Sequence, residues 1–249
     1  MDELFEVIAE DDDFLVVNKP AGLVCHPTKG DIYSSLISRA RLYLKAAEPS
    51  HLINRLDRET SGIVVLAKSI QVAAQLRKQW EKREVDKEYL AIVHGHLERP
   101  FVRVSAPLAK DHESRVAIKD KVAPEGTSAE TLVIRQKLFE REGKPFSLAR
   151  LVPLTGRKHQ LRIHLSHIGH PIVGDKIYGG DESLYLDFVV GKLTPEQSRR
   201  LLTEHHALHA NLLSFDWFGA RRTYACDPER WFLNFTKKPA SNLLPNLLE

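Results

Sequence analysis

The sequence predicts an α+β fold built on a mixed β-sheet. Strand-sized apolar runs and amphipathic helical segments both occur along the chain, but they do not follow the strict strand–helix–strand alternation of a parallel α/β fold. The sequence contains no internal repeat of the kind that indicates a solenoid or a propeller. The 249 residues, of which 43% are hydrophobic and 28% charged, suffice for one large domain or two closely joined lobes, and we expect a single catalytic domain over residues 1–249.

The first third of the chain is expected to contribute a hairpin, a helix and a buried strand. Residues 4–8 and 14–17 are short apolar runs around a polar turn, which is typical of a β-hairpin. Proline and glycine at 18–22 then interrupt regular structure. The pattern of 34–45 indicates a helix, and the β-branched run at 63–67 predicts a buried strand.

The middle of the chain adds a second helix and three more strands. An amphipathic pattern predicts a helix over 69–83, followed by a strand at 89–93. Residues 110–130 are polar and alternate only weakly, so we expect a protruding hairpin or loop there. Two further strands are predicted at 131–139 and 146–152.

Two more helices are marked by residues that are typical of helix ends. Thr155 is the expected N-cap of the first, and Gly169 followed by Pro171 ends it. Its apolar stripe consists of Leu161, Leu165 and Ile168. The second helix opens at residues 194–197, where a threonine cap, a proline and a glutamine form a capping box.

Composition excludes several classes of protein. Gly and Pro number 13 each and show no period, which rules out a fibrous or disordered chain. No apolar run approaches the roughly 20 residues that span a bilayer, and the acidic N-terminus does not resemble a secretory signal. Cys25 and Cys226 form neither a CxxC pair nor a disulfide framework, so a cytoplasmic location is expected.

The charge is distributed unevenly. The formal net charge is +3, but residues 1–13 contain seven acids and no base, so the remainder carries 36 basic against 26 acidic side chains. Residues 143–174 hold no acid, and they include Lys144, Arg150, Arg157, Lys158, Arg162 and four histidines. A basic body suits a polyanion such as RNA, because Lys and Arg on phosphates release condensed counterions. An ordinary solvated basic face is the alternative.

The densest polar cluster lies at residues 54–62, directly before a predicted strand. Asp57 stands there between Arg55 and Arg58. Neighbouring cations favour an ionised carboxylate, which can serve as a nucleophile or a base. A loop that leads into a buried strand is a rigid support for such a group. The alternative is a surface turn in which Asp57 caps a neighbour and the arginines face solvent.

A second cluster occupies residues 155–164. Arg162 projects from the flank of the apolar stripe, where its guanidinium can reach a partly buried carboxylate of another element. Arg157, Lys158 and the free N–H groups at the start of the predicted helix form a natural position for a phosphate. A plain amphipathic helix with a basic outer face is the alternative.

The two clusters resemble the two signature motifs of the RluA-type pseudouridine synthases. The motifs read Arg-Leu-Asp-Arg-Glu-Thr-Ser-Gly at 55–62 and Thr-Gly-Arg-Lys-His-Gln-Leu-Arg-Ile-His at 155–164. Further matches follow in the order of the family at 18–22, 87–93, 169–175 and 208–210. The resemblance covers roughly residues 5–215, whereas residues 216–249 match poorly and are an unassigned tail.

The resemblance assigns roles residue by residue. It implies that Asp57 is the catalytic aspartate, that Tyr89 is the active-site tyrosine, and that Arg162 pairs with the aspartate. It also implies that Arg55 helps to turn the uridine out of its stack. Asn54 departs from the family, which usually has a histidine there. The remaining candidates for binding RNA are Arg58, Arg157, Lys158 and His159.

The resemblance further implies a mostly antiparallel mixed sheet with flanking helices and a central cleft. The implied reaction converts specific uridines in structured RNA, either rRNA or tRNA, to pseudouridine. Because it is redox-neutral and consumes no water, we expect no cofactor and no metal. An ionised Asp57 would add to the substrate or assist departure of the uracil, and Tyr89 would stack on the base and assist loss of its C5 proton. Phosphate contacts would compensate for unstacking the uridine.

Two other functions fit parts of the sequence. Histidine spacings, such as His205 and His209 at i and i+4, could serve zinc, but HExxH is absent and neither cysteine is near these groups. A non-catalytic RNA-binding protein that keeps the fold would not need the aspartate.

The resemblance also bears on how the target RNA is chosen. The catalytic fold is expected to begin within the first five residues, without a separate N-terminal RNA-binding module. We expect edges that select the target at 105–130 and 181–206, and a monomer as the default state.

Overall fold

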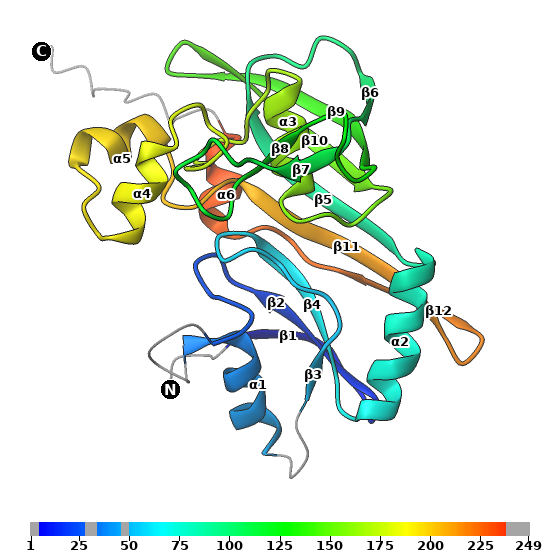
Figure 1. Cartoon of the computed structure of the whole chain (residues 1–249). Helices are drawn as coiled ribbons and strands as arrows, with labels where there is room; N and C mark the ends of the chain where they lie inside the picture. Colours follow the sequence, from blue (N-terminus) through cyan, green and yellow to red (C-terminus); the bar gives the residue numbers. More distant parts are fainter. Residues whose placement is uncertain (1–4, 28–33, 46–49, 238–249) are drawn as a thin grey trace, which may run out of the picture.

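The structure, a computed structural model, describes residues 5–27, 34–45 and 50–237, through which a ten-stranded sheet runs (Figure 1). The strands are β1 (Glu6–Glu10), β2 (Phe14–Lys19), β3 (His51–Leu52), β4 (Ser61–Ala67), β5 (Asp86–His94), β6 (Phe101–Ser105), β7 (Leu108–Lys110), β8 (Asp120–Val122), β9 (Glu130–Arg141), β10 (Lys144–Pro153), β11 (Leu208–Trp217) and β12 (Ala220–Ala225). The helices are α1 (Leu36–Leu44), α2 (Ile70–Lys82), α3 (Gln160–His167), α4 (Ser183–Val189), α5 (Pro195–Leu201) and α6 (Arg230–Phe235).

The sheet is mixed and mostly antiparallel. Its strand order is β1-β2-β4-β11-β5-β10-β9-β6, with β3 added to β4 and β12 added to β11. All of these pairs are antiparallel except that of β4 with β11. The predicted α+β class, with a mostly antiparallel mixed sheet and flanking helices, is therefore confirmed. Strands β7 and β8 form a separate two-stranded sheet, which is the hairpin predicted around 110–130.

The parallel pair of β4 and β11 joins two halves of the sheet. The pairing involves only Ser61 with His209 and Gly62 with Ala210. Gly62 has a φ of +113°, and a Cβ at this position would lie 2.2 Å from the carbonyl oxygen of Ala210. Only glycine permits so close an approach of two backbones. The Ser61 hydroxyl supports the junction, because it is hydrogen-bonded to His209 Nδ1 at 2.9 Å.

Helices α1 and α2 cover opposite faces of the N-terminal half of the sheet. Every residue of β4 is buried, and its side chains alternate between two hydrophobic clusters. Val64 belongs to the cluster that contains Leu36 of α1, whereas Ile63 belongs to the cluster that contains Leu76 of α2. The buried strand predicted at 63–67 therefore carries one helix on each side, as its continuous apolar sequence requires.

Most of the predicted elements are present. The hairpin of β1 and β2, the strand β5, and the long pair of β9 and β10 lie where the sequence places them. Ser35 and Ser69 cap α1 and α2 through their side chains, and the capping box predicted at 194–197 opens α5. None of the described helices is long and apolar enough to cross a membrane.

The predicted start of α3 is wrong. The helix begins at Gln160, and its N-cap is His159, which has a left-handed backbone and makes no side-chain cap. The Thr155 hydroxyl donates instead to Gln160 Oε1 at 2.6 Å and accepts the Glu130 N–H at 2.9 Å. Because these bonds fasten residues 155–159 to the start of β9, this segment is a packed loop rather than a first helical turn.

Residues 216–237 belong to the sheet and to its core. Strand β11 continues to Trp217, and β12 pairs along its C-terminal part. Helix α6 inserts Phe232 and Phe235 into the hydrophobic cluster that also contains Phe146 of β10. The described part of the unassigned tail is thus structured, although it does not match the motifs of the family.

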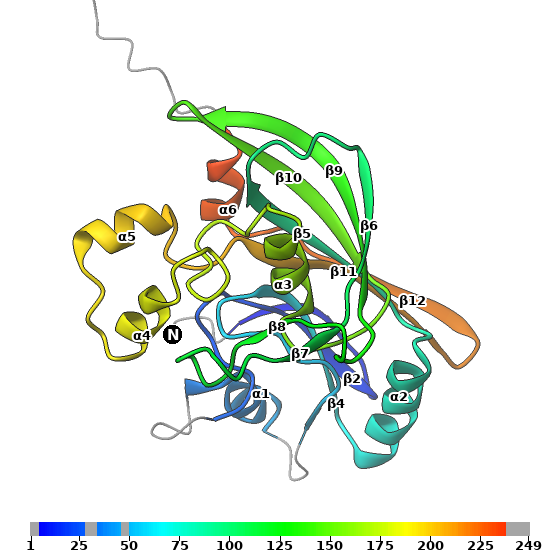
Figure 2. The same ribbon diagram turned by 45° about the horizontal axis from the view of Figure 1, so that its top comes forward.

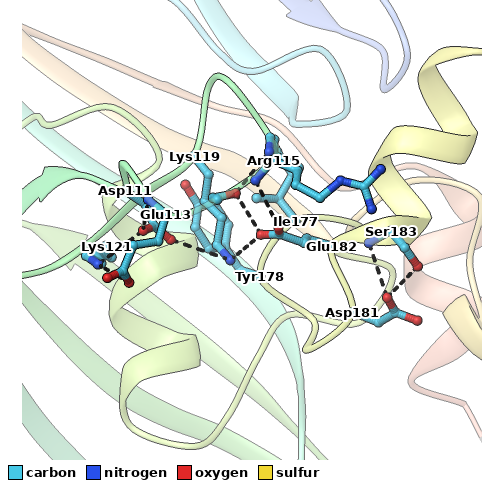
Figure 3. A network of polar contacts seen from close by, with 12 residues as sticks. Asp111, Glu113, Arg115, Lys119, Lys121, Ile177, Tyr178, Asp181, Glu182 and Ser183 are labelled. Carbon is cyan, nitrogen blue, oxygen red and sulfur yellow. Dashed lines mark hydrogen bonds and ion pairs between the residues drawn. The ribbon is translucent and has the colours of Figure 1, made fainter.

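The two segments predicted to select the target contact each other. Helices α4 and α5 project from one side of the molecule (Figure 2). Just before α4, the Glu182 carboxylate accepts hydrogen bonds from the Ser114 hydroxyl at 2.7 Å, the Arg115 N–H at 3.2 Å and the Lys119 ammonium at 2.6 Å (Figure 3). The loop between β7 and β8 is therefore tied to the segment that carries α4.

Candidate active site

One pocket of about 620 Å³ is lined by all eight predicted site residues. They come from the loop between β3 and β4, from β5, from the segment that leads into α3, and from α3 itself. The eight residues are Arg55, Asp57, Arg58, Tyr89, Arg157, Lys158, His159 and Arg162. Leu208 of β11 also lines the pocket, which therefore lies beside the junction of the two halves of the sheet.

Asp57 stands on a loop that is fastened to β4. The Asn54 side chain donates to the Ile63 carbonyl at 3.0 Å and accepts the Val65 N–H at 2.9 Å. The residue that departs from the family motif thus joins the loop to the strand in this chain. The Thr60 N–H closes the turn by donating to the Asp57 carbonyl at 3.2 Å. The Asp57 side chain is 32% exposed, which leaves its carboxylate open to the pocket.

Arg162 bridges two carboxylates. Its Nη1 lies 2.8 Å from Asp57 Oδ2, while its Nε and Nη2 lie 2.6 and 2.9 Å from the two carboxylate oxygens of Asp175. The Asp175 side chain has no exposed surface. Its Oδ1 also accepts the N–H groups of Ile177 and Tyr178, each at 2.9 Å. The structure thus brings the predicted pair together and adds a second, fully buried carboxylate behind it.

The charge of Arg162 determines the ionisation of Asp57. Burial raises the pKa of the Asp57 carboxyl, but the guanidinium of Arg162, the neighbouring His159 and His206, and the hydrogen bond from Arg162 together lower it further, so the pKa lies below its ordinary value. The carboxylate is therefore ionised at neutral pH while one side of it faces the pocket. That combination suits a nucleophile or a base.

Tyr89 faces the pocket from β5. Burial, and then the negative charge of Asp57, raises the pKa of its phenol to about 12. The phenol is therefore protonated at neutral pH. The pocket thus contains an aromatic ring and a hydroxyl donor close to an ionised carboxylate, which allows stacking and hydrogen bonding to a base.

Tyr178 and His159 lie next to Arg162 and contact each other. The Tyr178 ring lies 5.0 Å from the guanidinium carbon of Arg162, and its hydroxyl is hydrogen-bonded to His159 Nδ1 at 2.9 Å. His159 Nε2 lies 3.8 Å from Asp57 Oδ2. Burial lowers the pKa of His159 to about 4 despite the nearby Asp57. At neutral pH His159 therefore offers hydrogen bonds, but no positive charge, to a ligand.

The other four cations differ in how they are engaged. Arg55 is exposed, and neither Arg55 nor Arg157 forms an ion pair within the described part of the chain. Arg58 and Arg157 each donate through Nε to a backbone carbonyl at 3.2 Å, that of Gly22 and that of Ser128 respectively. Lys158 is paired with Asp120 at 2.8 Å, so part of its charge is already neutralised. Arg55 is therefore the most available of the four to an anionic ligand.

Asp175 and its neighbour Lys176 received no role from the sequence. Lys176 forms a buried ion pair with Glu59 at 2.7 Å. Adjacent residues of one segment therefore hold the loop that carries Asp57 at two points, through Arg162 to Asp57 and directly to Glu59. One signal could have identified Asp175, since it is the first acid after the acid-free stretch 143–174. A single acid next to a long basic segment has many cations to pair with.

Two buried basic side chains also hold the loop that carries Asp57. The Lys19 ammonium is fully buried and donates to three backbone carbonyls, including that of Arg58 at 3.1 Å. His206 Nε2 is hydrogen-bonded to the Thr60 hydroxyl at 2.7 Å. Burial lowers the pKa of His206 to about 4, so it is neutral at pH 7. Lys19 of β2 and His206 of the segment before β11 thus each contribute a hydrogen bond to the position of the loop.

The histidine spacings considered for zinc do not lead to a shared helix face. His209 lies in β11, and His205 lies in the segment before it, outside any helix. Nδ1 of His209 is hydrogen-bonded to Ser61, and Nε2 to the Cys226 carbonyl. In residues 5–27, 34–45 and 50–237, no group of three or more His, Cys, Asp or Glu side chains is placed to hold a metal ion.

Comparison with known proteins assigns the chain to a family. The model of the family described as RNA pseudouridylate synthase matches residues 13–167. The dual-specificity RNA pseudouridine synthase RluA of Vibrio parahaemolyticus is 35% identical over 213 residues, which cover 84% of this chain and 77% of the relative. The chain belongs to the RluA-type RNA pseudouridine synthases. RluA of Pasteurella multocida is 36% identical over 216 residues, which cover 86% of this chain and 88% of the relative.

The fold of the synthase is also that of a solved relative. Human RNA pseudouridylate synthase domain containing 1 superimposes with a TM-score of 0.72 and 26% identity, covering 90% of this chain and 83% of the human one. The protein is therefore an isomerase that converts uridine in RNA to pseudouridine. A binding protein without catalytic activity is not favoured.

Proposed function

We propose that Asp57 is the nucleophile of the isomerisation and acts on a uridine turned out of its stack into the pocket. The observation that carries the proposal is the contact of Asp57 with Arg162 at 2.8 Å. This contact stabilises the ionised carboxylate while leaving it partly exposed. An RNA-binding protein would not need an ionised carboxylate inside a basic pocket, because the carboxylate repels phosphate.

The reaction breaks the bond from ribose C1′ to uracil N1 and forms a bond from C1′ to C5. Asp57 would add to the substrate or assist departure of the uracil, and it is released when the new bond forms. One proton leaves C5 and one is gained at N1, so substrate and product have the same composition. No oxidant, reductant or water is consumed, and the chain needs no cofactor for this chemistry.

Tyr89 would lie against the base in this arrangement. Its ring can stack on the uracil, and its hydroxyl can donate a hydrogen bond while the base is detached. Because the phenol is protonated at neutral pH, it can assist loss of the C5 proton only by passing on its own proton at the same time. The role of the hydroxyl is therefore that of a relay or a donor.

The cations at the rim would bind the RNA backbone. Arg55 is exposed beside Asp57 and would fill the space that the uridine leaves in its stack. Arg58, Arg157, Lys158 and His159 would contact phosphates and riboses around the pocket mouth. We propose structured rRNA or tRNA as the substrate, and a cytoplasmic monomer as the active form.

Tritium release from bulk RNA labelled at uridine C5 tests the role of Asp57. Wild-type protein is expected to release tritium, whereas Asp57→Asn should release none above background and should still bind RNA. Asp12→Asn is the matched control, because this carboxylate is exposed and remote from the pocket lining. Release by Asp57→Asn at the wild-type rate would show that another group performs the attack.

A further inference from the structure

A second hollow of about 380 Å³ adjoins the pocket that contains Asp57. The two share the lining residues Trp80, Lys87, Pro153, Thr155, Gly156 and Arg157. Because Lys87 and Arg157 border both spaces, they stand on the ridge between them. On its far side the second hollow continues over the end of α2, where Arg83 lines it.

Lys87 is placed on this ridge without a counter-ion. It is two residues from Tyr89 on β5, so both side chains project from the same face of the strand. It is half-buried, yet it makes no ion pair or side-chain hydrogen bond with any residue that the structure describes. Gly156 lies next to its ammonium, since a Cβ at this glycine would be 4.0 Å from Lys87 Nζ.

The charges around the second hollow favour an anion. Burial, and then the positive charge of Arg83, lowers the pKa of Lys87. The hollow has two acids in its lining, Glu81 and Asp86. Asp86 is already ion-paired with Arg221, and Glu81 is exposed on α2. An anion held among the three cations would relieve their mutual repulsion and restore the favourable ionisation of Lys87.

We propose that the second hollow binds the nucleotide next to the target uridine, and that Lys87 and Arg157 hold the phosphate that links the two. This inference rests on the proposed function only in placing the uridine in the first pocket. A nucleotide carries a phosphate on each side of its ribose, so a uridine inserted into the pocket leaves one of these groups at the shared ridge. Arg83 contacts the far side of the same nucleotide.

The test compares Lys87→Met, which removes the charge but keeps the length of the side chain, with Lys87→Arg, which keeps the charge. Arg83→Gln is a second variant at an exposed position, and Lys78→Gln is the matched control, an exposed lysine on α2 outside both hollows. The readouts are KM and kcat for tritium release from labelled RNA, and the salt dependence of binding to a short fluorescent oligouridylate.

Lys87→Met is expected to raise KM about tenfold with little change in kcat. It should also reduce the slope of log K against log salt by about 0.7, the effect of one lost phosphate contact on a single strand. Lys87→Arg should retain the wild-type slope, and Arg83→Gln should reduce it, whereas Lys78→Gln should not.

Equal KM values and slopes for Lys87→Met, Arg83→Gln and Lys78→Gln would overturn the proposed subsite. A loss of kcat at unchanged KM in Lys87→Met would also overturn it, because Lys87 would then act in the chemistry. These outcomes are independent of Asp57, since binding of the oligouridylate requires no attack by the carboxylate. A failure of the Asp57 experiment would therefore leave the binding result interpretable.

Discussion

Arg162 makes two of its three carboxylate contacts with Asp175 and only one with Asp57. The fully buried Asp175 therefore fixes the plane of the guanidinium, and the accessible Asp57 takes the remaining N–H. Paired contacts of this kind set direction as well as strength. We infer that Asp175 positions the Asp57 carboxylate through Arg162, without touching the substrate.

Replacing Asp175 with asparagine is expected to reduce both activity and stability. The amide cannot neutralise Arg162, so breaking this buried pair should cost about 3–5 kcal/mol of unfolding free energy. The pKa of Asp57 should fall further, because Arg162 would then be shared with no other carboxylate. Chemical denaturation and single-turnover tritium release measure the two effects. Asp227→Asn, an exposed carboxylate, is the control, and equal rates for both variants would contradict a positioning role.

Tyr89→Phe should bind RNA normally and turn over slowly. The ring that we propose to stack on the base is retained, whereas the hydroxyl is lost. Since the pKa of Tyr89 is about 12, the wild-type rate should not change through titration of this group between pH 7 and pH 10. Single-turnover rates across that range test the assignment. Full activity of the variant would remove the hydroxyl from the mechanism.

Acid should destabilise the protein in a window set by its buried neutral histidines. The pKa of His206 falls from 6.5 to about 4 on burial, so between these values the unfolded chain binds a proton that the native protein does not. The contribution of His206 to the unfolding free energy is therefore fully present above pH 6.5. It falls by on the order of 3 kcal/mol as the pH drops toward 4.

This pH window can be tested by replacing His206 with a side chain that cannot ionise. His206→Gln can keep the hydrogen bond to Thr60, and its unfolding free energy should change less between pH 7 and pH 4.5 than that of the wild type. His112→Gln is the control, because His112 is exposed. A curve for His206→Gln that parallels the wild type would assign the acid sensitivity to other groups.

Gly62→Ala should be far more destabilising than Gly143→Ala. Both glycines have positive φ, +113° and +72°, so both variants carry backbone strain. Only at Gly62 would the added Cβ collide with backbone, at 2.2 Å from the Ala210 carbonyl oxygen, whereas nothing lies within 4 Å at Gly143. We expect a difference of about 2 kcal/mol or more in unfolding free energy. Similar losses of unfolding free energy in the two variants would show that β4 and β11 can move apart at their junction without destabilising the protein.

The sequence predicts the elements of this fold better than their neighbours in space. Hydrophobic period and helix caps locate β4, α1 and α2, because these signals are local. They do not reveal that β11 lies between β4 and β5, since the pairing is decided by packing across the whole sheet. Thr155 was mistaken for a helix cap for the same reason. Its hydroxyl bonds to Glu130 of β9 and to Gln160, and no local pattern shows the first of these partners.

The candidate site shows the same difference between what local sequence predicts and what it does not. The eight predicted residues of the pocket follow from two long motifs and from the match at 87–93 that resemble a known family, and the structure places all eight together. Asp175 and Tyr178 were missed because their effect passes through Arg162, and a side chain that acts on a neighbour has no signature of its own. Asn54, which departs from the family, proved to fasten the loop of Asp57 to β4.

The place of β11 in the sheet has a consequence for the newly made protein. The strand that joins the halves of the sheet that carry Asp57 and Tyr89 is Leu208–Trp217, which is synthesised only after both residues. Long-range pairing of this kind forms late in folding. A nascent chain that lacks β11 therefore has Asp57 without the Leu208 wall of the pocket. We expect the onset of catalysis to wait until β11 has been synthesised and paired.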